Sequence, residues 1–264
     1  IHKEKKVLMT NKSDYLSNYF RTQYDITNLD RLHILSYKEV LEKLNIKEKE
    51  VNDSEIAPTN KYDVIIIDEA QDFNEEEAFF LRNLTLSESS EFYVFYDNEQ
   101  NIYNNELDKT LDNFLIEKPP YVLTENLRNT RNIYEWVKIK TKFARQTYTN
   151  QIDGPDPQCL VFSSKNQTCR YINNTINTLI KKDEVPIQYI KLIIDDEIYQ
   201  YFDNVEWNLK YEKNNYSINS KTINIIKTSD FKGLESNVII YVHKYNSDKN
   251  FSYVGLTRAR FYLY

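Results

Sequence analysis

The sequence has 264 residues with a net charge of −6, of which 41% are hydrophobic and 28% are charged. This composition is that of a folded soluble protein with one large or two small domains. The sequence contains no run of 18 apolar residues, the length that a membrane-spanning helix needs. Two cysteines and three histidines leave little for a disulfide framework or a zinc site and fit a reducing, cytoplasmic compartment. A pI near 5.3 argues against a protein that coats nucleic acid through bulk charge, but it allows a local basic groove.

Strands alternate with helices in the first part of the chain. Hydrophobic patterns predict strands at 5–10, 32–36, 62–68 and 91–97, and helices at 13–21, 37–44 and 74–84. The run YDVIIID at 62–68 is typical of a central parallel strand that is covered on both faces. Repeated strand–helix–strand units indicate a doubly wound α/β sheet.

A second α/β unit follows. The pattern predicts a strand leading into a helix at 130–143, a helix at 166–182, and strands at 159–164, 187–194, 222–228, 238–243 and 261–264. Residues 195–220 have no clear period and stay unassigned. Because Pro119 and Pro120 interrupt the pattern, we expect two domains, 1–118 and 119–264.

The strongest chemical signal is IIIDEAQDF, in which Asp68 and Glu69 follow an apolar strand. The carboxyl edge of a parallel sheet is where open α/β sheets bind ligands. Asp68 could hold Mg²⁺ through its water shell, and Glu69 could polarise an attacking water. The alternative is a plain acidic loop after a buried strand. A bare Asp-Glu pair would favour this alternative, but the whole string IIIDEAQDF argues against it.

The string YDVIIIDEAQDF resembles motif II of the UvrD/Rep-type superfamily 1 DNA helicases. Five further matches occur in the family order and cover nearly the whole chain: VLMTNKSDYL (7–16) resembles motif Ia, FYVFYDNEQNIY (92–103) motif III, ENLRNTRNI (125–133) motif IV, KTSDFKGLESNVIIYV (227–242) motif V and FSYVGLTRARFYLY (251–264) motif VI. The resemblance implies an α/β fold of two RecA-like lobes with mostly parallel sheets, of which the first, at 1–118, is incomplete at its N-terminus and the second is at 119–264.

The resemblance also implies roles in ATP hydrolysis. It assigns Glu69 to the attacking water, Gln100 to sensing the γ-phosphate, and Arg128 and Arg258 to the charge on the transferred phosphoryl group, a task that suits the planar guanidinium. The residues implied to bind the nucleotide are Asp68 (through Mg²⁺), Gln71, Gly233 and Glu235, the last as an acceptor for a ribose hydroxyl.

Single-stranded DNA, or RNA, is the implied partner. The residues expected at nucleic acid are Thr10, Asn11 and Lys12 of the motif Ia match, Tyr103 as a stacking ring, and Lys232 at a phosphate. A partner nuclease or fused domains are further partners, and no membrane is expected. The cofactors implied are ATP and Mg²⁺.

The phosphate-cradling loop GxxxxGK[ST] does not occur, because the three glycines are Gly154, Gly233 and Gly255. In the family this loop lies shortly before motif Ia. We therefore expect the sequence to be part of a longer protein, and this segment alone to hydrolyse no ATP.

Three functions compete at this point. The first is the core of an ATP-dependent helicase or translocase that moves on single-stranded DNA. The second is a UvrD-like ATPase that acts as a nucleotide- or DNA-sensing switch without unwinding, for example in antiviral defence. The third is a degenerate, non-enzymatic module that binds nucleic acid or protein. Strand displacement separates the first two, and nucleotide binding separates both from the third.

Overall fold

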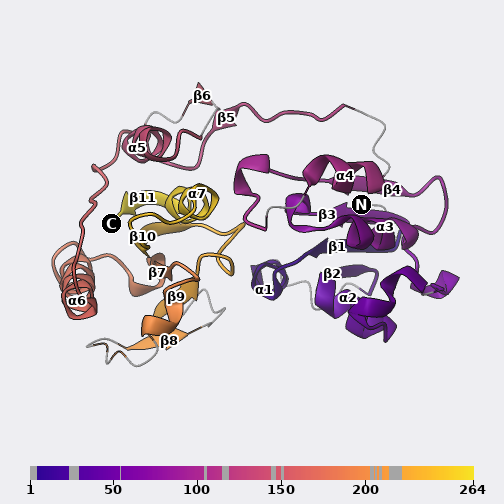
Figure 1. Ribbon diagram of the computed structural model, residues 1–264, viewed down its shortest axis with the longest axis horizontal. Helices are drawn as coiled ribbons and strands as arrows, with labels where there is room; N and C mark the ends of the chain where they lie inside the picture. The colour runs from indigo at the N-terminus through magenta and orange to yellow at the C-terminus, as the bar shows by residue number, and fades with distance from the viewer. Residues whose placement is uncertain are drawn as a thin grey trace. The chain divides into compact units, whose positions relative to one another are not determined.

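The computed structural model, shown in Figure 1, describes residues 5–23, 30–53, 55–103, 106–114, 119–143, 147–149, 152–202, 205, 207, 210–213 and 222–264. The chain packs as two compact units, Ile1–Tyr121 and Val122–Tyr264. Each unit has its own parallel sheet and its own hydrophobic core. The predicted α/β fold with parallel sheets is thereby confirmed and is consistent with RecA-like lobes, whereas the limits of the two lobes stay predictions.

The first unit is built on a four-stranded sheet of order β2-β1-β3-β4, in which all neighbours are parallel. The strands are β1 (Val7–Asn11), β2 (Leu32–Ser36), β3 (Val64–Ile67) and β4 (Glu91–Val94). Because all four run the same way, their carboxyl ends meet at one edge. The residues that follow β1, β3 and β4 therefore lie close together there.

Helices and loops of the first unit connect these strands. The helices are α1 (Asp14–Gln23), α2 (Tyr37–Leu44), α3 (Glu75–Asn83) and α4 (Leu107–Asn113), with short 3-10 helices at Glu48–Asp53, Pro58–Asn60, Ala70–Asp72 and Asn98–Gln100. Capping boxes fix the starts of α2 and α3, through Ser36 with Glu39 and Asn74 with Glu77. Ser13 accepts a hydrogen bond from the Leu16 backbone, as expected for the cap of α1.

The second unit contains a five-stranded parallel sheet of order β11-β10-β7-β9-β8. Its strands are β7 (Ile190–Ile194), β8 (Tyr211–Lys213), β9 (Ile223–Lys227), β10 (Ser236–Val242) and β11 (Ala259–Leu263), and a separate short pair joins β5 (Glu125–Asn126) to β6 (Thr147–Tyr148). The helices are α5 (Arg131–Thr141), α6 (Lys165–Lys181) and α7 (Lys249–Thr257), with 3-10 turns at Ile187–Tyr189 and Tyr199–Phe202.

Helices cover both faces of this second sheet (Figure 1). On one face, Ile172, Ile176 and Leu179 of α6 pack on alternate residues of β7, β9 and β10. The other face lies under α7, which also packs against α5. Because β7 is buried on both faces, it has the continuous apolar pattern of a central strand, interrupted by Lys191.

Gly255 lets the ring of Tyr241 lie directly under α7. A Cβ atom at position 255 would lie 2.5 Å from Cζ of that ring, which is 7% exposed. We therefore expect Gly255→Ala to destabilise the protein by about 1–3 kcal/mol through overpacking, although alanine favours helix. Urea unfolding measures this effect, and Gly255→Ala without loss of stability would contradict the contact.

Lys191 is a buried cation in the centre of the second sheet. Its side chain is 8% exposed, lies on the face that α7 covers, and has no acidic partner among the described residues. Burial lowers the pKa of its amine to about 8. The protonated amine is therefore more stable in the unfolded chain than in the folded protein. Burying this charge lowers the free energy of unfolding most below pH 8, and the loss fades as the pH rises toward 10.5.

We expect Lys191→Met to stabilise the protein at pH 7 by up to about 3 kcal/mol, because it removes this desolvation cost. The gain should shrink between pH 8 and pH 10.5. Urea unfolding at pH 7 and pH 10 measures both effects, with the exposed Lys181→Met as the matched control. A gain that is equal at both pH values would point to packing alone.

One predicted strand needs correction, and one unassigned stretch can be described. Residues 159–164 form no strand, although all of them are described: the Gln158 backbone donates to Leu263 O of β11, but the pairing does not continue. Leu160 and Val161 are 55% and 77% exposed, so their high strand propensity lacks the sheet partner that it needs. The unassigned stretch 195–220 contains β8 and the 3-10 turn at Tyr199–Phe202, and several of its other residues lie outside the described part.

Candidate nucleotide site

The carboxyl edge of the first sheet brings Asp68 beside the end of β1. The Asp68 backbone donates to Thr10 O at 2.9 Å, which continues the β1–β3 pairing by one residue. An Asp68 carboxylate oxygen accepts from the Glu69 backbone at 3.0 Å. This contact fixes the turn in which the carboxylates leave the strand.

Glu69 has a left-handed backbone, with φ 53° and ψ 46°. A non-glycine residue in this region costs about 1 kcal/mol, a strain that structures keep mainly at functional sites. The Glu69 carboxylate accepts a hydrogen bond from Nε2 of Gln71 at 2.6 Å. The backbone conformation and this bond together define where the carboxylate points.

A chain of hydrogen bonds then links the motif II and motif III matches. Oε1 of Gln71 accepts from the Asp97 backbone at 3.0 Å, and Nε2 of Gln100 donates to Oδ2 of Asp97 at 2.7 Å. Glu69 and Gln100 are thus joined through Gln71 and Asp97. Gln71 is fully buried, and its amide group already bonds to Glu69 through Nε2 and to the Asp97 backbone through Oε1. Its contact with a nucleotide stays a prediction.

The three residues expected at nucleic acid after β1 differ in exposure. Thr10 is fully buried, and its hydroxyl meets no hydrogen-bond partner within the described part of the chain. Asn11 is 1% exposed, donates to Ser17 Oγ and accepts from the Ser13 backbone, so it shapes the turn into α1. Lys12 is half-buried and pairs with Glu77 at 2.7 Å. Tyr103, in contrast, is 51% exposed, as a stacking ring needs to be.

In the second unit, the motif IV and motif V matches meet at Glu235. Nε of Arg128 donates to one Glu235 oxygen at 2.8 Å, and the other oxygen lies 3.5 Å from Nη1 of Arg260. The structure thus brings Arg128 and Glu235 together. It adds Arg260, which sequence reasoning missed although it lies two residues after Arg258.

Arg258 and Lys232 are buried inside the second unit, at 1% and 3% exposure. The Arg258 guanidinium donates to Val254 O at 3.0 Å, Leu234 O at 3.3 Å and Thr257 Oγ1 at 3.0 Å. It therefore joins the end of α7 to the turn before β10, where Gly233 has a left-handed φ of 78°. A contact of Arg258 or Lys232 with phosphate stays a prediction.

Asn129 is a second residue that sequence reasoning missed. It is 2% exposed, and its amide donates to Thr257 O at 3.0 Å and Ala259 O at 2.6 Å. These bonds attach the segment of Arg128 to the end of α7. The only sequence signal was its place directly after Arg128.

Asp68 supplies a carboxylate suited to Mg²⁺, which binds one or two carboxylates together with water and phosphate oxygens. No group of three or more His, Cys, Asp or Glu residues within the described ranges could hold a metal ion by itself. The single carboxylate of Asp68 fits an ion that is otherwise held by water and phosphate oxygens. Over the same ranges, no helix is long and apolar enough to cross a membrane.

Comparison with known protein families finds a match over most of the first unit. Residues 3–107 match the family described as UvrD/REP helicase N-terminal domain. No curated protein matches the chain. The matched range contains Asp68, Glu69 and Gln100, together with the part-buried chain of hydrogen bonds that joins Glu69 to Gln100. This match over the first unit supports a helicase of the UvrD/Rep type.

Proposed function

We propose that the protein is the core of an ATP-dependent helicase or translocase of the UvrD/Rep type that acts on single-stranded nucleic acid. The hydrogen-bonded chain Glu69–Gln71–Asp97–Gln100 is the observation that carries the proposal. It connects a carboxylate that can act on water with an amide that can sense a phosphate. A solvated acidic loop would have no need of this part-buried connection, which passes through the fully buried Gln71.

The proposed reaction is hydrolysis of the γ-phosphate of ATP. Glu69 orients a water and takes its proton as the water oxygen attacks phosphorus, while the bond to the ADP oxygen breaks. Gln100 senses the γ-phosphate, and Arg128 and Arg258 stabilise the charge on the transferred group. Mg²⁺, held by Asp68, would neutralise charge on the phosphate oxygens. Gly233 and Glu235 are proposed to contact the nucleotide.

The nucleic-acid residues are part of the same proposal. Tyr103 is the stacking ring, and Lys12 and Lys232 are the cations for backbone phosphates, with Thr10 and Asn11 shaping the turn beside Lys12. The pair Lys12–Glu77 would have to open for Lys12 to reach a phosphate. This requirement predicts that affinity depends on salt less steeply than the number of lysines suggests.

ATP turnover by the natural full-length protein, with and without single-stranded DNA, tests this function. We expect turnover that DNA stimulates, together with displacement of a paired strand. Stimulated turnover without displacement would favour a nucleotide- or DNA-sensing switch. Absence of nucleotide binding would overturn the proposal and favour a non-enzymatic binding module.

A further inference from the structure

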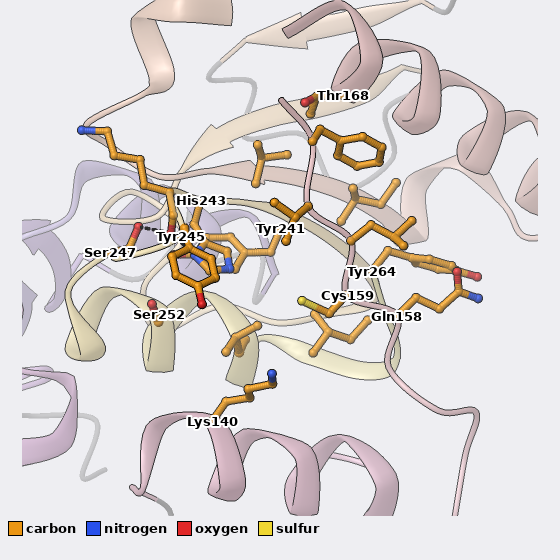
Figure 2. A pocket seen from close by; sticks show the side chains of 18 of the residues that line it. Lys140, Gln158, Cys159, Thr168, Tyr241, His243, Tyr245, Ser247, Ser252 and Tyr264 are labelled. Atoms are coloured by element: carbon orange, nitrogen blue, oxygen red, sulfur yellow. Dashed lines mark hydrogen bonds between the residues drawn. The ribbon is translucent and has the colours of Figure 1, made fainter. Parts of the chain in front are cut away.

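A pocket of about 650 Å³ lies within the second unit, apart from every residue assigned above (Figure 2). It is bounded by α5, the segment Gln158–Phe162, the start of α6, the loop after β10 and the start of α7. The segment Gln158–Phe162 forms one wall because it runs beside β11 without pairing along it. The stretch that was expected to be a strand is thus the side of a cavity.

Several aromatic rings line the pocket. Tyr241 and His243 stack on each other, with ring centroids 4.9 Å apart and an interplanar angle of 15°, and Tyr245 next to them is 86% exposed. Trp136 and Phe162 line the pocket from α5 and the unpaired segment. The Tyr241 ring is buried between α7 and His243, so the rings open to the pocket are His243, Tyr245, Trp136 and Phe162. Open flat rings of this kind bind other flat rings by stacking.

The charge of the lining is of one sign. Lys140, Lys244 and Lys249 line the pocket, and no Asp or Glu stands among the described lining residues. Lys244 also pairs with Glu197, just outside the lining, at 2.6 Å. Lys140 Nζ lies 5.3 Å from the centre of the Trp136 ring, so a cation and a ring are presented together. Asp195 also lies just outside the lining, where it accepts a hydrogen bond from Ser247 Oγ at 2.6 Å. Lys140 and Lys249 are therefore the lysines that the pocket offers to an anionic ligand.

We propose that this pocket binds a nucleotide unit, with the base against the rings and the phosphate at the lysines. A planar base and a phosphate one sugar apart match a ring-lined cavity with a cationic rim. Two sources share this chemistry: a free nucleoside monophosphate and one nucleotide of a single strand. The proposal is separate from the ATP site, and its test does not depend on turnover.

Cys159 provides a probe inside the pocket. Figure 2 shows its side chain directed into the space between the unpaired segment and the loop that contains Tyr245. It is exposed, whereas Cys169 is half-buried and burial raises the pKa of that thiol. Alkylation by N-ethylmaleimide, followed by peptide mass spectrometry, therefore reports on Cys159 with Cys169 as the reference in the same molecule.

The alkylation of Cys159 is measured in the natural full-length protein with adenosine or thymidine monophosphate in one series and a short single-stranded oligonucleotide in another. We expect protection of Cys159 but not of Cys169. Protection by the monophosphate identifies a free nucleotide as ligand, and protection by the oligonucleotide alone identifies a strand. Lys140→Glu and Tyr245→Ala should each raise the half-protecting concentration by about tenfold, because a charge contact or a stacking contact is lost.

Lys181→Glu is the matched control, since Lys181 is an exposed lysine of α6 outside the pocket. It changes the net charge by the same amount and should leave protection unchanged. The proposal is overturned if neither ligand protects Cys159 at millimolar concentration. It is also overturned if protection persists undiminished in both pocket variants, because binding elsewhere would then be the cause.

Discussion

Glu69→Gln should lower the turnover number for ATP by about 10³-fold in the natural full-length protein, within the range expected when a general base is lost. The amide cannot take the proton of the attacking water. It has nearly the shape of the carboxylate and can still accept the hydrogen bond from Nε2 of Gln71. The chain to Asp97 and Gln100 should therefore survive, and nucleotide affinity should change little.

Steady-state turnover and equilibrium nucleotide binding, measured on the same preparation, check this result. Glu76→Gln is the matched control, because Glu76 is an exposed carboxylate of α3 and makes the same loss of charge. It should leave turnover within about twofold of the parent protein. Equal turnover in Glu69→Gln would remove Glu69 from the role of base, and loss of binding as well as turnover would indicate a structural role.

Arg258→Ala should destabilise the second unit by about 3 kcal/mol, because the change empties the space of a large side chain that is 1% exposed. The substitution also removes the donors for Val254 O, Leu234 O and Thr257 Oγ1. Buried acceptors that lose their donors cost about 1–3 kcal/mol each unless water replaces the bond. The expected loss is therefore as large as the gain expected from Lys191→Met, with the opposite sign.

Urea unfolding measures this effect, and Arg260→Ala is the control. Arg260 lies two residues later, has a half-exposed side chain and makes a long contact with Glu235, so its loss should cost less than about 1 kcal/mol. If Arg258→Ala unfolds at the same urea concentration as the parent and loses turnover alone, the buried bonds of Arg258 contribute nothing to folding. Its proposed contact with phosphate would then be its main role.

Local sequence was sufficient for most of the first unit. The predicted strand at 32–36 and helix at 37–44 agree with β2 and α2 residue for residue, because Ser36 and Glu39 form a capping box that fixes the boundary. The order of strands and helices followed from periodicity, and the carboxylates after β3 followed from the rule for parallel sheets. These features depend on neighbours within a few residues.

The role of Gln71 could be predicted only in part. Its place in the motif II match pointed to the nucleotide, whereas the structure places its amide between Glu69 and the backbone of Asp97, 26 residues later. Which atoms a side chain meets across that distance depends on how β3 and β4 align in the sheet. Pattern and spacing do not contain that alignment.

The sequence by itself determined the α/β class and the order of most elements, since both rest on short-range patterns. Its motifs singled out the carboxylates and arginines, whose roles stay predictions. Only the tertiary structure decided that Arg258 and Lys232 are buried, that Lys12 pairs with Glu77, and that 159–164 lines a pocket instead of joining the sheet. The reason is physical: burial and pairing are settled by which surfaces pack together, and the residues involved are far apart along the chain.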